Sequence, residues 1–210
     1  MPIKKTASKR SFFKLGLFSL VLSIAGCNTG YQEVEGKWSF VTWDEGHGTR
    51  VNPLDVDPAT FQVLKNKDYA KDDKTVFFLG SPIEGAHAPS FETLKGKYFA
   101  KDQDHVFLRS FTVINADPKT FKEIRFPYAK DANKVYCGTL PMQVDQIDEF
   151  KVVKGSSSIS MISKEEFIRQ YGDQFEFLDE LKDHFLVHGS GKAKTKTQRF
   201  VDFHLSDHSK

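Results

Sequence analysis

"YAKDDKTVFF", residues 69–78, decides the fold, because this segment recurs twice more along the chain with small changes. "YFAKDQDHVFL" stands at residues 98–108 and "YAKDANKVYC" at residues 128–137. Phenylalanine recurs in step with the phrase, at intervals of 30, 30 and 29 residues, at Phe61, Phe91, Phe121 and Phe150. Self-similarity at a fixed period of about 20 to 50 residues is typical of repeat architectures. We therefore predict a stack of structural units rather than several copies of a chemical group.

Each unit is predicted to contain three short β-strands, rich in aromatic and branched residues. In the first unit they are "TFQVL" (60–64), "KDYAKD" (67–72) and "TVFFL" (75–79), with turn residues such as Asp57-Pro58 between units. Strands this short are marginal alone, and stacking buries a shared apolar face. The expected fold is mainly β: tandem ~30-residue antiparallel repeats. A solenoid, a propeller-like array and one meander sheet all remain open.

The three phrases, each linked to a "DPxTF"-like element, resemble the DKNYY repeat family of bacterial proteins across about residues 44–154. The string at residues 131–136, "DANKVY", comes nearest to the family's eponymous sequence. The resemblance supplies no catalytic residues to transfer. The chain departs from the pattern at Gln103, Ala132, Phe77, Phe107 and Cys137.

After a polar break at residues 155–160, the pattern predicts a small α+β cap over the open end of the strands. Ser163 to Glu166 form a capping box that opens a helix to Tyr171, which Gly172 ends. A second helix is expected from Asp173 to His188, with Leu178, Leu181 and Phe185 on one face. "QRFVDFHL", residues 198–205, is expected to be a single strand.

The first residues are typical of an export signal. Five basic residues precede an apolar stretch, Leu15 to Ala25, which has the length of a secretory h-region and is too short to span a bilayer. Ile24-Ala25-Gly26-Cys27 resembles the lipobox of bacterial lipoproteins. The resemblance implies a diacylglycerol thioether on Cys27, cleavage after Gly26 and an acylated, for example palmitoylated, amine. An ordinary signal peptide with a free Cys, or a short uncut anchor, remains the alternative.

We therefore expect a signal peptide at residues 1–26, a short tether at 27–36, the repeat domain at 37–154 and the C-terminal segment at 155–210. Residues 37–54 are interpreted as the second half of a worn earlier repeat. The protein would be exported and held on a membrane by lipid. Asn28 lacks the acidic charge associated with inner-membrane retention, which favours an outer membrane where the cell has one.

Charge and cysteine usage limit the classes of binding partner and of covalent cross-link that we expect. The chain has 30 basic and 28 acidic residues, and the signal holds five of the basic ones, so the chain from Cys27 would have a formal charge of −3. That balance, with export, argues against nucleic acid as a partner. The cysteines are Cys27 and Cys137, so lipidation of the first would leave no intramolecular disulfide. Cys137 is interpreted as a small buried residue, with a reactive thiol as the alternative.

The repeated charge pairs, such as Lys71-Asp72, are interpreted as turn residues, because equivalent positions one repeat apart do not converge on one active site. No nucleophile-elbow, P-loop or dinucleotide motif is present, and no cofactor is expected. His184 and His188, like His204 and His208, are spaced i,i+4, but the Glu of an HExxH zinc motif is missing.

We therefore predict a non-catalytic binding or structural module whose partners are membrane lipid and an envelope protein or glycan, since aromatic rings can stack on sugars. The alternative is a cell-envelope hydrolase built from His184, His188 and nearby acids.

Overall fold

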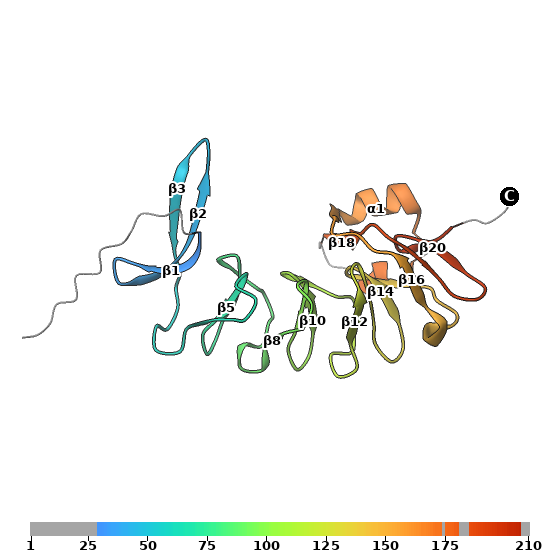
Figure 1. Cartoon of the computed structure of the whole chain (residues 1–210), viewed down its shortest axis with the longest axis horizontal. Helices are drawn as coiled ribbons and strands as arrows, with labels where there is room; N and C mark the ends of the chain where they lie inside the picture. Colours follow the sequence, from blue (N-terminus) through green and yellow to red (C-terminus); the bar gives the residue numbers. More distant parts are fainter. Residues whose placement is uncertain (1–28, 174, 181–184, 207–210) are drawn as a thin grey trace, which may run out of the picture.

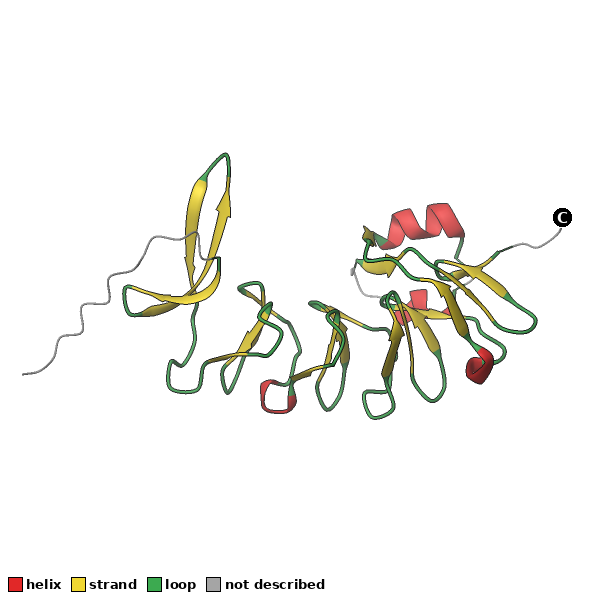
Figure 2. Cartoon of the chain, viewed as in Figure 1, coloured by secondary structure: helices red, strands yellow, loops and turns green. Residues whose placement is uncertain are grey.

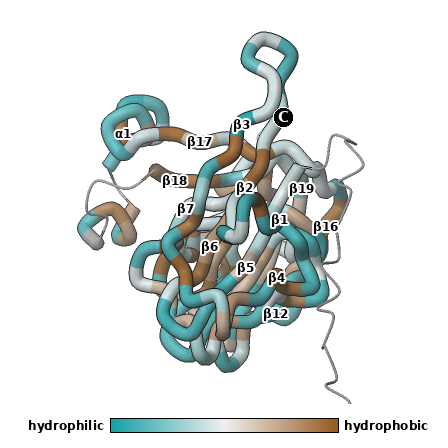
Figure 3. The backbone as a smooth tube through the Cα atoms, turned by 90° about the vertical axis from the view of Figure 1, so that its left-hand side faces the viewer, coloured by the Kyte–Doolittle hydropathy of each residue, from teal (hydrophilic) through white to brown (hydrophobic). Residues whose placement is uncertain are grey.

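A computed structural model of the protein describes residues 29–173, 175–180 and 185–206. The chain forms a row of small antiparallel sheets that runs from the N-terminal to the C-terminal part (Figure 1). Helical segments are short and gather mainly toward the C-terminal end (Figure 2). Seen along the row, the sheets of successive repeats lie behind one another (Figure 3). The expected mainly β repeat fold is confirmed, as an open row of separate sheets.

Each complete repeat is a four-stranded meander, one strand more than predicted. The extra strand forms because the residue after the third strand has positive φ and closes a two-residue hairpin, as Leu79 does with φ 48° between paired Phe78 and Ser81. The first unit contains β4 (Gln62–Val63), β5 (Tyr69–Lys71), β6 (Val76–Phe78) and β7 (Ser81–Pro82). The second contains η1 (Ala88–Ser90), β8 (Glu92–Thr93), β9 (Phe99–Lys101), β10 (Val106–Leu108) and β11 (Phe111–Thr112). The third contains β12 (Lys122–Arg125), β13 (Tyr128–Lys130), β14 (Val135–Cys137) and β15 (Leu140–Met142).

A fourth repeat follows, and a long insertion interrupts it. Its strands pair in the same order, β16-β19-β20-β21, although residues 155–191 separate the first strand from the second. The sheet therefore extends past the expected boundary at residue 154. The prediction of a single strand over residues 198–205 is wrong, because Asp202, with φ 55°, turns the chain into a hairpin. The elements are η2 (Ile147–Glu149), β16 (Lys151–Lys154), β19 (Lys192–Lys194), β20 (Arg199–Val201) and β21 (His204–Leu205).

The insertion contains β17 (Ile159–Ile162), α1 (Lys164–Tyr171), the 3-10 turn η3 (Glu176–Glu180) and β18 (Leu186–Gly189). The predicted cap of α1 is confirmed, because the Ser163 side chain accepts a hydrogen bond from the Glu166 N–H at 3.2 Å. Of the predicted second helix from Asp173 to His188, residues 174 and 181–184 lie outside the described residues. The rest of the prediction is wrong, because Glu176–Glu180 form a 3-10 turn and Leu186–Gly189 form a strand. Leu186 and Val187 are both fully buried, and β18 pairs with β17 instead, since a strand buried on both faces accommodates consecutive apolar residues.

A separate three-stranded sheet precedes the first repeat, formed by β1 (Gly30–Val34), β2 (Lys37–Asp44) and β3 (Gly48–Pro53). Half of the expected tether at residues 27–36 is thus a strand, because Glu35 and Gly36, both with positive φ, form a tight hairpin turn. The expected half-repeat at residues 37–54 is instead the β2–β3 hairpin, longer than any hairpin of the repeats.

Aromatic rings connect the units through the core. The Phe91 ring lies 5.6 Å from Phe107 of its own unit and 5.6 Å from Tyr69 of the preceding unit. Phe121 and Phe150 make the corresponding contacts in the third and fourth units. Phe61 is only half-buried, because it lies at the end of the row. Trp38 of β2, rather than a preceding repeat, packs against its ring there. Within the described residues, no helix has the length and apolar character needed to cross a membrane.

Candidate functional site

The repeated aspartates hold the turns together. In the first unit, Asp72 Oδ1 accepts the backbone N–H groups of Lys74 and Thr75 at 2.8 and 2.6 Å, and Oδ2 accepts that of Asp57 at 3.1 Å. Burial alone would raise the pKa of the Asp72 carboxyl, but these three hydrogen bonds outweigh it and hold the pKa below its usual value. Asp102 and Asp131 make the same three bonds in their units, which confirms the turn interpretation.

The "DPxTF"-like element closes each unit from the other side. The hydroxyl just before the recurrent phenylalanine accepts a backbone N–H from the residue after the buried aspartate, as Thr60 does from Asp73 at 3.3 Å. Ser90 and Thr120 do the same for Gln103 and Ala132. The two recurring segments of the repeat are therefore two halves of one hydrogen-bonded corner.

The repeated lysines connect neighbouring units. Lys71 Nζ donates to the carbonyl oxygens of Ala88 at 2.7 Å and of Phe91 at 3.0 Å, both in the second unit. Lys101 Nζ donates to the Pro118 carbonyl of the third unit at 2.9 Å. The lysine and the aspartate of these pairs therefore both form hydrogen bonds within the repeats themselves.

The histidines of the alternative hydrolase hypothesis are only partly within the described residues, which leave out His184 and His208. His188 is buried in β18, its ring 5.2 Å from that of Phe203, and burial lowers its pKa. No group of three or more His, Cys, Asp or Glu side chains in the described part of the chain is arranged to hold a metal.

The two cysteines lie in different parts of the chain. Cys137 is fully buried in β14, its thiol donates to the Gly189 carbonyl at 3.2 Å, and burial raises its pKa to about 12. The buried-residue interpretation is confirmed. Cys27, the predicted lipidation site, lies outside the described residues.

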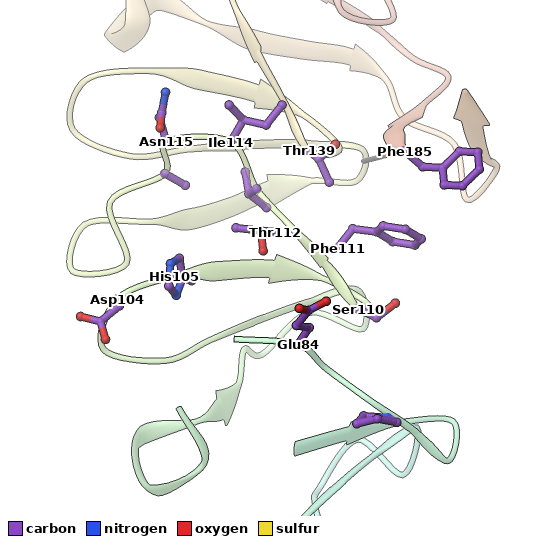
Figure 4. A pocket seen from close by; sticks show the side chains of 13 residues that line it. Glu84, Asp104, His105, Ser110, Phe111, Thr112, Ile114, Asn115, Thr139 and Phe185 are labelled. Atoms are coloured by element: carbon purple, nitrogen blue, oxygen red, sulfur yellow. The ribbon is translucent and has the colours of Figure 1, made fainter. Parts of the chain in front are cut away.

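An open groove of about 640 Å³ lies over the first three units, from Pro82 of β7 to Thr139 (Figure 4). Its floor is β11 and the chain that follows it, and Phe185 of the insertion stands at one end. Sequence reasoning missed this groove, because neither the fourth strands nor the position of the insertion was predicted. The side chains that line it include Glu84, Asp104, His105, Ser110, Phe111, Thr112 and Phe185.

A glycine determines where the insertion docks. Thr139 donates its N–H to the Val187 carbonyl at 2.7 Å, and its Oγ1 accepts the Val187 N–H at 3.0 Å. Gly138 has φ 65°, and a Cβ there would lie 2.2 Å from the Val187 carbonyl oxygen. The equivalent residues of the first two units are Leu79 and Arg109, whose side chains exclude such an approach.

The DKNYY family matches residues 17–111 and again residues 99–207. The two matches overlap in the second repeat and together span nearly the whole chain. The chain belongs to the DKNYY family. No curated protein and no solved structure matches it. In this DKNYY protein the family match extends through the insertion and the fourth repeat, well beyond the resemblance recognised at residues 44–154.

On the described residues, the groove of this DKNYY protein combines an exposed ring with polar side chains, of which Asp104 also accepts a hydrogen bond from Gln103 Nε2 at 3.0 Å. Phe185 is 54% exposed, and Phe111, which also lines the groove, is half-buried. Glu84 and Asp104 contribute carboxylates, and His105 a ring nitrogen. Such a surface can stack on an apolar face and accept hydrogen bonds from hydroxyl or amide groups.

Proposed function

We propose that this DKNYY protein is a non-catalytic binding module of the bacterial cell surface, held on a membrane by lipid on Cys27. The repeats are its scaffold, and the groove over the first three units is its binding surface. One observation carries the proposal: the repeated carboxylates and ammonium groups are used by backbone partners inside the scaffold, whereas the groove side chains face an open space.

An envelope glycan fits the groove best. Sugar rings have apolar faces that stack on aromatic side chains, and their hydroxyl groups donate to carboxylates such as Glu84 and Asp104. An envelope protein segment is the competing ligand. The formal charge of −3 on the chain from Cys27 disfavours strongly acidic ligands.

Lipid attachment is tested by mass spectrometry of the protein purified from its own membrane. The expected result is an N-terminal Cys27 bearing a diacylglyceryl group, and Cys27→Ala should leave an unprocessed precursor. A mature chain that begins elsewhere would overturn the anchor.

Groove binding is tested by co-sedimentation with isolated envelope glycan. We expect Phe185→Ala to weaken binding while the protein stays folded, because the ring is largely exposed. Val153→Ala removes an equally exposed apolar side chain outside the groove and is the matched control. Equal binding by both variants and the parent would exclude the groove. Hydrolysis of the glycan, lost in His188→Ala, would favour the alternative of an envelope hydrolase.

A further inference from the structure

The β2–β3 hairpin exposes apolar side chains on one face. Trp43 is 48% exposed and Val51 is 44% exposed. Val41 pairs with Val51 and Trp43 pairs with Thr49, so the exposed side chains of Trp43 and Val51 share one side of the hairpin with the buried Val41. The hairpin stands out from the row of repeats, with its connecting turn at the far end (Figure 1). Within the scaffold, tryptophan is otherwise used for packing, as Trp38 is against Phe61.

The start of β1 places the anchor residue beside this face. Gly30 pairs with Val41, and β1 runs antiparallel to β2, so the chain before Gly30 leaves the sheet on the side of the hairpin turn. Cys27 precedes Gly30 by three residues, which reach at most about 10 Å when extended. Trp43 lies two residues beyond Val41 in the same direction, a rise of about 7 Å along the strand. Three residues are therefore long enough for a lipid on Cys27 to reach the level of the Trp43 ring.

From this geometry we infer that the end of the β2–β3 hairpin is a second membrane contact, with Trp43 and Val51 at the lipid–water interface. The inference rests on the proposed lipid anchor. Tryptophan is favoured at this depth, because its ring is apolar and its N–H can still bond to water or headgroups. Two contacts hold the row of repeats at a defined angle to the membrane, whereas a single flexible tether would let it swing.

The charges of the turn indicate how this contact works. Asp44 Oδ1 accepts the backbone N–H groups of Gly46 and His47 at 3.0 and 2.7 Å, and Oδ2 lies 3.9 Å from Arg50 Nε. Glu45 adds a second carboxylate at the turn. The turn is not basic, so attraction to anionic lipid does not drive the contact. If burial of the Trp43 ring at the interface drives the contact, the hairpin should bind neutral vesicles as well as anionic ones.

The test uses the full lipidated chain in phosphatidylcholine vesicles that carry brominated acyl chains. The protein has two tryptophans, so Trp38→Phe leaves Trp43 as the reporter, and Trp43→Phe is the matched control. We expect brominated lipid to remove most of the Trp43 emission and to leave that of Trp38 largely unchanged. If Trp38→Phe does not fold, the difference between the parent and Trp43→Phe gives the same quantity.

Mass spectrometry of Cys27 in the same sample separates the two proposals. An acylated Cys27 with Trp43 emission insensitive to brominated lipid overturns the hairpin contact and leaves the anchor standing. An unmodified Cys27 overturns the lipid anchor, and the hairpin contact with it, because the inference rests on that anchor.

Discussion

The hydroxyl of Tyr69 donates a 3.0 Å hydrogen bond to the backbone carbonyl of Arg109, one repeat further along the chain. Tyr128 makes the same bond to the carbonyl of Asp202, also at 3.0 Å. Both acceptors have positive φ and occupy the same turn of their repeats. The bond therefore crosses from the first unit to the second and from the third to the fourth, and identifies residues 192–205 as a genuine part of the repeat.

Removing this hydroxyl should weaken the contact between two units. We expect Tyr69→Phe and Tyr128→Phe each to lower the free energy of unfolding by about 0.5–1.5 kcal/mol, as measured in urea. Tyr98→Phe is the control, because the Tyr98 ring stacks on Phe126 at 3.9 Å and keeps that contact, so its change should stay within about 0.5 kcal/mol. Equal losses for all three variants would contradict an inter-unit role.

Acid should destabilise the repeats through their buried carboxylates. For Asp131, burial would raise the pKa, but hydrogen bonds from the N–H of Asp117, the Tyr136 hydroxyl and two turn N–H groups lower it overall, as for Asp72. A carboxyl with a lowered folded pKa stabilises the protein fully above its unfolded value of about 3.8, and this contribution is lost as pH falls through the folded pKa.

The measurement is urea unfolding between pH 7 and pH 2. Asp131→Asn should lose about 1.5–3 kcal/mol at pH 7, because the amide nitrogen cannot accept the Asp117 N–H or the Tyr136 hydroxyl. Its stability should also fall less steeply in acid than that of the parent. Asp73→Asn, at the exposed neighbouring turn position of the first unit, should follow the parent curve.

The fourth repeat shows what a period search cannot find. Ala193-Lys194 and Phe200 repeat Ala70-Lys71 and Phe77, but residues 155–191 displace them from the 30-residue step. Thr195 also replaces the aspartate. Its Oγ1 nevertheless accepts the N–H groups of Thr197 and Gln198 at 3.3 and 3.0 Å, as the carboxylate does elsewhere. A hydroxyl can accept the same local hydrogen bonds as a carboxylate. The residue types differ, however, so the repeat pattern alone does not align Thr195 with the aspartates.

The repeat and the cap of α1 could be predicted from the sequence, because turn and capping interactions act between residues close in sequence. The groove depends on Val187 meeting Thr139, 48 residues away. That contact is possible because Gly138 leaves room for it, and the sequence offers no sign of which segment fills the space. The expected second helix failed for the same reason, since burial of Leu186 and Val187 against the third and second units outweighs local helix preference.

The thiol of Cys137 should be unreactive in the folded protein. Burial raises its pKa to about 12, so little thiolate exists at pH 8, and the side chain is inaccessible. In a Cys27→Ala chain, we expect iodoacetamide to label Cys137 roughly a hundredfold or more slowly than the urea-unfolded chain. The labelling rate should rise with urea in step with the unfolding transition. Rapid labelling without urea would contradict the packing of β14 against the insertion.

The aromatic contacts between units lead to the strongest stability prediction. Phe91 and Phe121 are 3% and 6% exposed and occupy equivalent positions, so truncation of either to Ala should cost about 3–5 kcal/mol in urea unfolding. Phe61→Ala should cost less, because that ring is half-buried at the end of the row. Phe185→Ala, which removes an exposed ring, should stay within about 0.5 kcal/mol. A loss for Phe61 as large as for Phe91, or small losses at Phe91 and Phe121, would contradict a core formed by stacking successive repeats.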